Sequence, residues 1–269
     1  MGQINQFDEG LLTPVAAYAI SCVGAVLGLA CTTRAHAAAA GWARRRWFAL
    51  GAFAIGGTGI WATHFVAMLG FAVEGTPIRY DVPLTLASLA VAVVVVGAGL
   101  AVAAHDTGRV ALLAAGGAVT GIGVATMHYV GMAALRMRGH VSYDPATVAI
   151  SVGVAIVAAT LALYAALNIR TPGASLGAAL AMGVAVGGMH YTGMTAVSVE
   201  VDAHNSPLSG AETSHLLAPP AAGLTLCTIA ALCMVGWRPH PDEDETPARA
   251  DAPAEPPGPV TIERVPPPS

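Results

Sequence analysis

Apolar residues follow one another in long runs along this chain, and polar residues are confined to short segments between the runs. A helix that spans a bilayer needs about 20 apolar residues, and seven runs reach that length. We therefore expect an all-α membrane protein with seven transmembrane helices. The expected spans are Leu11–Thr33, Trp47–Val73, Val82–Ala104, Val110–Leu135, Pro145–Leu167, Ser175–Val199 and Leu217–Trp237.

The segments that flank these runs define the expected domains. Residues 1–10 form a short segment before the first span, and residues 11–237 form the membrane domain. Residues 238–269 are rich in Pro, Asp and Glu, a composition that cannot bury an apolar core. We expect this last segment to be a disordered tail.

Composition supports a membrane protein and narrows the function. The chain of 269 residues is 55% hydrophobic and only 10% charged, whereas soluble domains average about 25% charged residues. A net charge of −4 gives no case for a nucleic-acid partner, so the lipid bilayer is the expected surrounding. The sequence contains no phosphate loop, nucleophile elbow or paired carboxylates, and we expect no enzymatic activity.

Arginines fall unequally on the two sides of the predicted spans. One side carries Arg34, Arg44, Arg45, Arg46, Arg109, Arg170 and Arg238, and the other carries Arg79, Arg136 and Arg138. Positive side chains are enriched on the cytoplasmic side of membrane proteins. We therefore expect the N-terminus outside and the C-terminus in the cytoplasm.

A six-residue motif occurs three times in the second, fourth and sixth runs. Residues 63–68 read Thr-His-Phe-Val-Ala-Met, residues 127–132 Met-His-Tyr-Val-Gly-Met and residues 189–194 Met-His-Tyr-Thr-Gly-Met. The near-constant spacing indicates an internal repeat, which we interpret as a helical hairpin used three times with a seventh helix appended. A glycine precedes each histidine by seven residues (Gly57, Gly121 and Gly183).

Helical periodicity places the shared residues of each motif on one face. Offsets of −7, 0, +3 and +4 from the histidine lie on the same side of a helix. All three motifs also lie in the outer halves of their helices. We expect the three histidines and the methionines that follow them to point inward and to meet near the outer face. The aromatic residues that follow the histidines (Phe65, Tyr129 and Tyr191) are expected to join the interfacial aromatic belt.

Histidine and methionine together are typical of a copper site. An ionisable side chain within a bilayer marks a functional site by default, and imidazole with thioether suits copper, above all Cu(I). Haem is an alternative, because His and Met are also its axial ligands. A purely structural alternative has each histidine bonding a neighbouring carbonyl, with methionine as flexible filler.

The repeated Met-His-Tyr-x-Gly-Met motif resembles the MHYT domain of bacterial membrane sensors, over roughly Leu11 to Trp237. The resemblance implies a multi-pass sensory module of the bacterial inner membrane that binds copper and senses a diatomic gas, namely oxygen, carbon monoxide or nitric oxide. The implied metal ligands are His64, Met68, Met127, His128, Met132, Met189, His190 and Met194. The first repeat departs from the motif at Thr63, Phe65 and Ala67.

Members of this family often carry a cytoplasmic signalling domain after the last helix. Only about thirty residues follow Trp237 here, so we expect a stand-alone form that signals through a separate cytoplasmic protein. Other functions remain open: a copper-handling or transport protein, a haem-binding membrane protein, or a structural scaffold.

Overall fold

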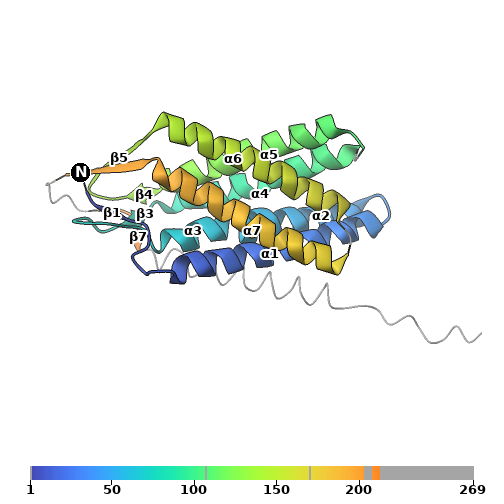
Figure 1. Ribbon diagram of the computed structural model, residues 1–269, viewed down its shortest axis with the longest axis horizontal. Helices are drawn as coiled ribbons and strands as arrows, with labels where there is room; N and C mark the ends of the chain where they lie inside the picture. The colour runs from blue at the N-terminus through green and yellow to red at the C-terminus, as the bar shows by residue number, and fades with distance from the viewer. Residues whose placement is uncertain (1, 107, 170, 203–207, 213–269) are drawn as a thin grey trace, which may run out of the picture. The chain divides into compact units, whose positions relative to one another are not determined.

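The helices of the protein, described by a computed structural model, agree closely with the predicted spans (Figure 1). The structure describes residues 2–106, 108–169, 171–202 and 208–212. Its helices are α1 (Leu12–Ala37), α2 (Trp42–Phe53), the π-helix η1 (Ala54–Ala62), α3 (Thr63–Met68), α4 (Val82–His105), α5 (Val110–Ala133), α6 (Pro145–Asn168) and α7 (Pro172–Thr195). Because α2, η1 and α3 are continuous, the described residues contain six spans long and apolar enough to cross a membrane.

The predicted seventh span and the predicted tail lie outside the described residues. The arrangement of three hairpins plus a seventh helix therefore stays a prediction. The outward faces of the described helices are strongly apolar, since Val94, Leu161 and Val184 are 66%, 63% and 65% exposed. Such an outward surface is suited to lipid.

The first connection is shorter than predicted. Helix α1 continues to Ala37 and α2 begins at Trp42, so the arginines assigned to a loop lie in helices. Arg34 and Arg46 lie over the ring of Trp47, 5.2 and 5.9 Å from its centroid. Arginine stems can run along apolar surface while their charged heads reach water, which allows the helices to extend past the apolar run.

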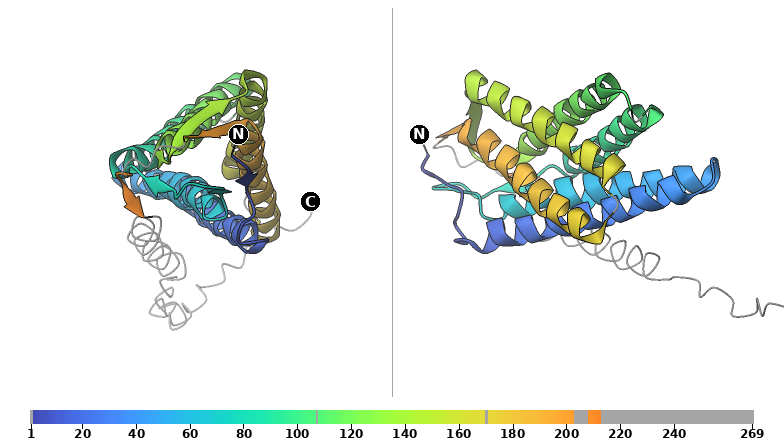
Figure 2. Two further views of the ribbon diagram at one scale, coloured as in Figure 1. Left: turned by 90° about the vertical axis from the view of Figure 1, so that its left-hand side faces the viewer. Right: turned by 45° about the vertical axis from the view of Figure 1, so that its right-hand side comes forward.

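The helices form a closed ring, seen end-on in Figure 2. Helix α1 packs against the second span, which packs against α4; α4 then contacts α5, α5 contacts α6, α6 contacts α7, and α7 returns to α1. The three motif helices alternate with α1, α4 and α6 around this ring. A ring of this kind gives each motif helix an inward face directed at the other two.

Short strands cover the end of the ring at which the motif helices finish (Figure 1). They pair antiparallel as β1 (Ile4–Asn5) with β2 (Ala72–Val73), β3 (Arg79–Tyr80) with β4 (Leu135–Arg136) and β7 (Ala211–Glu212), and β5 (Gly139–Tyr143) with β6 (Val197–Val201). The hydrophobic pattern of the sequence predicts helix or loop in these segments. Apolar residues such as Val73, Val197 and Val199 simply extend the preceding apolar run, which hides the change of structure.

One backbone hydrogen bond recurs three times at this end. In each case the N–H of an aspartate that precedes a helix donates to the carbonyl six residues after a motif histidine. The pairs are Asp8 to Gly70 (3.0 Å), Asp81 to Ala134 (2.8 Å) and Asp144 to Ala196 (2.9 Å). These bonds fix the C-terminal ends of α3, α5 and α7, and with them the depth of the three motifs.

Candidate metal centre

The three motif histidines meet at the centre of the ring. The Nδ1 atom of His64 lies 3.0 Å from Nδ1 of His190 and 3.2 Å from Nδ1 of His128. The ring centroids are 4.9 to 5.3 Å apart, and all three side chains are buried. The predicted convergence of the histidines is confirmed; their role as metal ligands remains a prediction. We refer to His64, His128 and His190 as the histidine triad.

The triad cannot satisfy its own hydrogen-bonding groups. A neutral imidazole has one N–H donor and one acceptor nitrogen. If every imidazole carries its proton on Nε2, the lone pairs of the three Nδ1 atoms face one another. If one imidazole carries its proton on Nδ1, that N–H can donate to only one of the other two nitrogens at a time. Nε2 of His64 and Nε2 of His128 are also buried without a partner in the described structure. Buried polar groups in this condition destabilise a fold unless something else binds them.

A metal ion would relieve this conflict, and the geometry fits one. Metal–imidazole bonds of about 2.0 Å in a trigonal arrangement separate the nitrogens by roughly 3.5 Å. The Nδ1 separations of 3.0 and 3.2 Å are short of this by only a few tenths of an ångström. Among the described residues, the cluster consists of three imidazoles with no carboxylate or thiol. This donor set suits copper or zinc and disfavours calcium and magnesium.

The motif methionines are all buried within the same ring of helices. These are Met68, Met127, Met132, Met189 and Met194. Met132 lines a pocket at the strand-covered end together with Tyr143, whereas Met189 lines a cavity deeper in the ring. The methionines are therefore distributed along the axis of the ring, and their role as ligands stays a prediction.

Two glycines of the motif make room for the imidazoles, a function that the sequence pattern does not reveal. A β-carbon added to Gly131 would lie 2.6 Å from Nε2 of His64, and one added to Gly193 would lie 2.6 Å from Nε2 of His128. Each of these glycines therefore accommodates the histidine of the preceding repeat. A glycine seven residues before a histidine packs against a neighbouring helix: Gly121 lies against the backbone of Ile156.

The aromatic residue of each motif packs on its own histidine. The centroids are 4.7 Å apart for His64 and Phe65 and 4.9 Å apart for the other two pairs, all edge to face. Phe65 is buried and contacts Trp61 and Tyr80, so its predicted place in the interfacial belt is wrong. The physical reason is that strand β3, which the hydrophobic pattern does not predict, brings Tyr80 over this end of the ring.

Hydrogen bonds to neighbouring helices hold two of the aromatic side chains around the triad, Tyr129 and Trp61. The hydroxyl of Tyr129 lies 2.8 Å from Oγ of Ser151 on α6. Trp61, one turn before His64, donates from Nε1 to Oγ of Ser88 on α4 at 3.0 Å. These bonds position the ring that packs on His128 and the ring that packs on Phe65.

Comparison with known proteins agrees with this arrangement. Residues 57–116 and 121–179 match the family described as MHYT, bacterial signalling protein N terminal repeat. The chain belongs to the MHYT family. The two matched MHYT repeats begin at Gly57 and Gly121, seven residues before their histidines. With six apolar spans described, this MHYT protein is a multi-pass membrane protein of a signalling family.

Several curated MHYT relatives are bacterial signalling proteins. The bifunctional diguanylate cyclase/cyclic di-GMP phosphodiesterase MucR of Pseudomonas aeruginosa is 38% identical over 194 residues, which are 70% of this chain and 28% of the relative. The cyclic di-GMP phosphodiesterase NbdA of the same organism is 39% identical over 59% of this chain and 21% of its own length. The signaling protein YkoW of Bacillus subtilis is 31% identical over 57% and 20%. The chain thus matches less than a third of the length of each relative. No solved structure matches it.

Proposed function

We propose that this protein is a sensor of the bacterial inner membrane that binds copper at the histidine triad and responds to a diatomic gas. One observation carries the proposal: three buried imidazoles direct Nδ1 atoms at one another at 3.0 and 3.2 Å. A cation bound between them would accept all three lone pairs at once. A triad of this kind on three different helices also links the packing of the ring to the state of the bound ion.

Copper, and Cu(I) in particular, is the metal that this surrounding favours. Neutral imidazoles carry no charge to balance a hard divalent ion, and the motif methionines, whose thioethers are soft ligands, are buried in the same ring of helices. When bound, cuprous copper with three nitrogen ligands supplies a further coordination position for a small molecule such as oxygen, carbon monoxide or nitric oxide. The protein's own residues hold the three nitrogens at fixed orientation and exclude water from them.

Copper transport is the second candidate function, but the ring contains few ligands along which a copper ion could move. The cavity on the inner side of the triad has two thioethers in its wall, from Met182 and Met189. Seven residues of helix separate them by about 10 Å, which is too far for direct transfer of an ion. The remaining wall is almost entirely aliphatic. This composition favours a sensor over a relay.

Metal analysis of the purified protein tests the proposal. We expect about one copper per chain, lost when His64, His128 and His190 are all replaced by alanine, and retained in the control His140→Gln, whose side chain is exposed. Carbon monoxide should perturb the spectrum of the copper-loaded protein. A Soret band in protein isolated without copper would assign the site to haem, and stoichiometric zinc in place of copper would assign it to zinc.

A sensor in the membrane needs a second protein or domain that receives its signal. The MHYT relatives are signalling proteins by name, which supports a partner on the cytoplasmic side that responds to the state of the ring. A separate cytoplasmic protein is the partner that we propose. Absence of enzymatic activity in this chain stays a prediction.

A further inference from the structure

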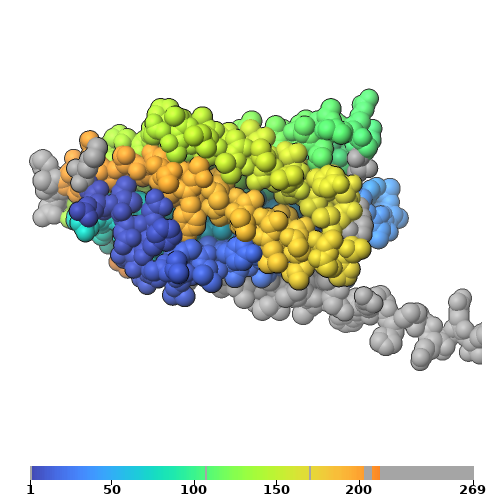
Figure 3. Space-filling view, viewed as in Figure 1, coloured from blue at the N-terminus to red at the C-terminus, as the bar shows by residue number. Residues whose placement is uncertain are grey.

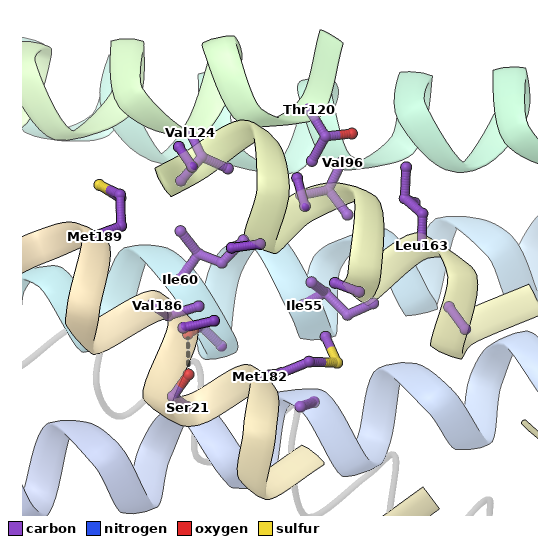
Figure 4. A pocket seen from close by; sticks show the side chains of 18 residues that line it. Ser21, Ile55, Ile60, Val96, Thr120, Val124, Leu163, Met182, Val186 and Met189 are labelled. Carbon is purple, nitrogen blue, oxygen red and sulfur yellow. Dashed lines mark hydrogen bonds between the residues drawn. The ribbon is translucent and has the colours of Figure 1, made fainter. Parts of the chain in front are cut away.

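An apolar cavity of about 50 Å³ lies inside the ring of helices (Figure 4). Its two hydroxyl groups are already engaged, because Ser21 donates to the Gly59 carbonyl at 2.9 Å and Thr120 to the Val95 carbonyl at 3.4 Å. The rest of the wall is hydrocarbon and thioether. Apolar cavities without free polar partners stay dry and take guests such as xenon. This one has room for a guest of diatomic size.

One end of the cavity adjoins the histidine triad. Ile60, Val124 and Val186 line it, and each precedes its motif histidine by four residues. Side chains four residues apart lie one above the other on a helix. These three side chains, drawn around a common space in Figure 4, therefore form an apolar collar about one helical turn from the imidazoles. Met189, which precedes His190, continues this wall.

The cavity also reaches the lipid-facing surface, between α6 and α7. Ala158 and Ala162 of α6 and Ala185 of α7 line the cavity and yet are only half-buried. In Figure 3, teal atoms from the far side of the ring are visible between α6 and α7. By contrast, the α5–α6 contact at Gly121 is closed by the backbone of α6.

We infer that this cavity is a binding site for small apolar molecules, which enter from the lipid phase between α6 and α7 and pass the collar to reach the triad. Diatomic gases are more soluble in hydrocarbon than in water, so the bilayer is the richer source. The last step of this route rests on the proposed metal centre, whereas binding in the cavity does not. The two parts therefore need separate measurements.

Xenon binding tests the cavity itself. We expect the purified protein to bind xenon saturably in xenon NMR, and Ala162→Phe to weaken that binding at least tenfold by filling the cavity mouth. The matched control is Leu161→Phe, the neighbouring residue with a 63% exposed side chain, which should bind xenon as the wild type does. Ala185→Phe blocks the same mouth from α7 if the first variant does not fold. Unchanged xenon binding in folded Ala162→Phe and Ala185→Phe would overturn the site.

Carbon monoxide kinetics test the route. In copper-loaded protein, Ala162→Phe should slow carbon monoxide association at least tenfold with its copper content unchanged, and Leu161→Phe should not. Val124→Ala widens the collar and should raise the rate. Equal rates in the blocked and wild-type proteins would overturn the route. Xenon binding by a protein that holds no copper would contradict the proposed function and still support the cavity.

Discussion

At the scale of single residues, the repeated motif describes contacts between repeats more than contacts within one helix. Gly131 accommodates the imidazole of His64, and Gly193 that of His128. The glycine at +3 could be found in the sequence, but its purpose could not. Helical periodicity assigns a residue to a face, whereas the neighbour that occupies this face depends on the order of helices around the ring.

Gly193→Ala is expected to disturb the triad directly. The added methyl group would need the imidazole of His128 to move, because its position lies 2.6 Å from Nε2. Overpacking of this kind costs about 1–3 kcal/mol, and we expect a lower melting temperature together with reduced copper content. The matched control is Gly188→Ala on the same helix, where the methyl group meets nothing within 4 Å; it should be neutral or stabilising. Full copper content in Gly193→Ala would show that His128 can move freely.

Replacing a motif histidine should reduce copper binding far more than replacing the methionine before it. In the first repeat this position is Thr63, whose hydroxyl donates to the Gly59 and Ala17 carbonyls at 2.9 and 3.3 Å. The −1 position there bonds backbone carbonyls and not the triad. We therefore expect Met127→Leu to keep its copper, at a stability cost below about 1.5 kcal/mol, and His128→Ala to weaken copper binding at least tenfold. Metal content and competitive chelator titration measure both. Equal losses in the two variants would make the −1 thioether a ligand.

At the scale of elements, apolar runs predicted the helices well and the strands not at all. Helix α4 begins at Val82, α5 at Val110 and α6 at Pro145, as predicted, because polar residues and helix caps mark these positions. The outer ends were placed too late, since Val197 and Val199 of β6 extend the apolar run of the helix before them. Strand pairing depends on segments far apart in sequence, such as Tyr143 opposite Val197. A local pattern does not contain that information.

Protonation of Asp81 should weaken the strand-covered end. The Arg136 guanidinium at 2.7 Å, and then the N–H of Leu84 at the start of α4, hold the pKa of this carboxyl below its ordinary value. A lowered folded-state pKa means that the stabilisation is present above the unfolded-state pKa and is lost as pH falls through the folded-state pKa. The melting temperature should therefore fall as the pH drops below about 5, toward and through the lowered pKa of Asp81.

Thermal scans of the detergent-solubilised protein across pH measure this effect. The Asp81→Asn protein should melt a few degrees lower than the wild type at neutral pH, and its melting temperature should depend less on pH. Asp144, whose pKa is lowered by Thr147, accounts for the pH dependence that remains. Arg136→Gln removes the ion pair and keeps the cap, so its effect should be smaller. Glu74→Gln at an exposed position serves as the control. An unchanged pH profile in Asp81→Asn would remove this carboxyl from the stability of the fold.

At the scale of the whole molecule, a closed ring turns three separate motifs into one centre. Motif spacing in the sequence predicted that the histidines would share a depth, and the inward face of each helix followed from periodicity. The choice of Nδ1 as the converging atom could not be predicted, because it depends on the rotation of each imidazole. Edge-to-face contacts with Phe65, Tyr129 and Tyr191 set that rotation. The same closure creates the apolar cavity, which no single helix reveals.

The orientation of this ring in the membrane is expected to place the strand-covered end, and with it the triad, near the periplasmic face. The reason is the excess of arginine at the opposite end, where Arg44, Arg45 and Arg46 lie near the start of α2. Positive side chains are enriched on the cytoplasmic side of membrane proteins. Single cysteines in a chain freed of its native cysteines, Ser198→Cys in β6 and Ala39→Cys in the α1–α2 turn, report the two ends at exposed positions. A membrane-impermeant maleimide should label Ser198→Cys in intact cells whose outer membrane admits it, and Ala39→Cys only after the inner membrane is opened. The reverse labelling would invert the topology and move the triad to the cytoplasmic half of the bilayer.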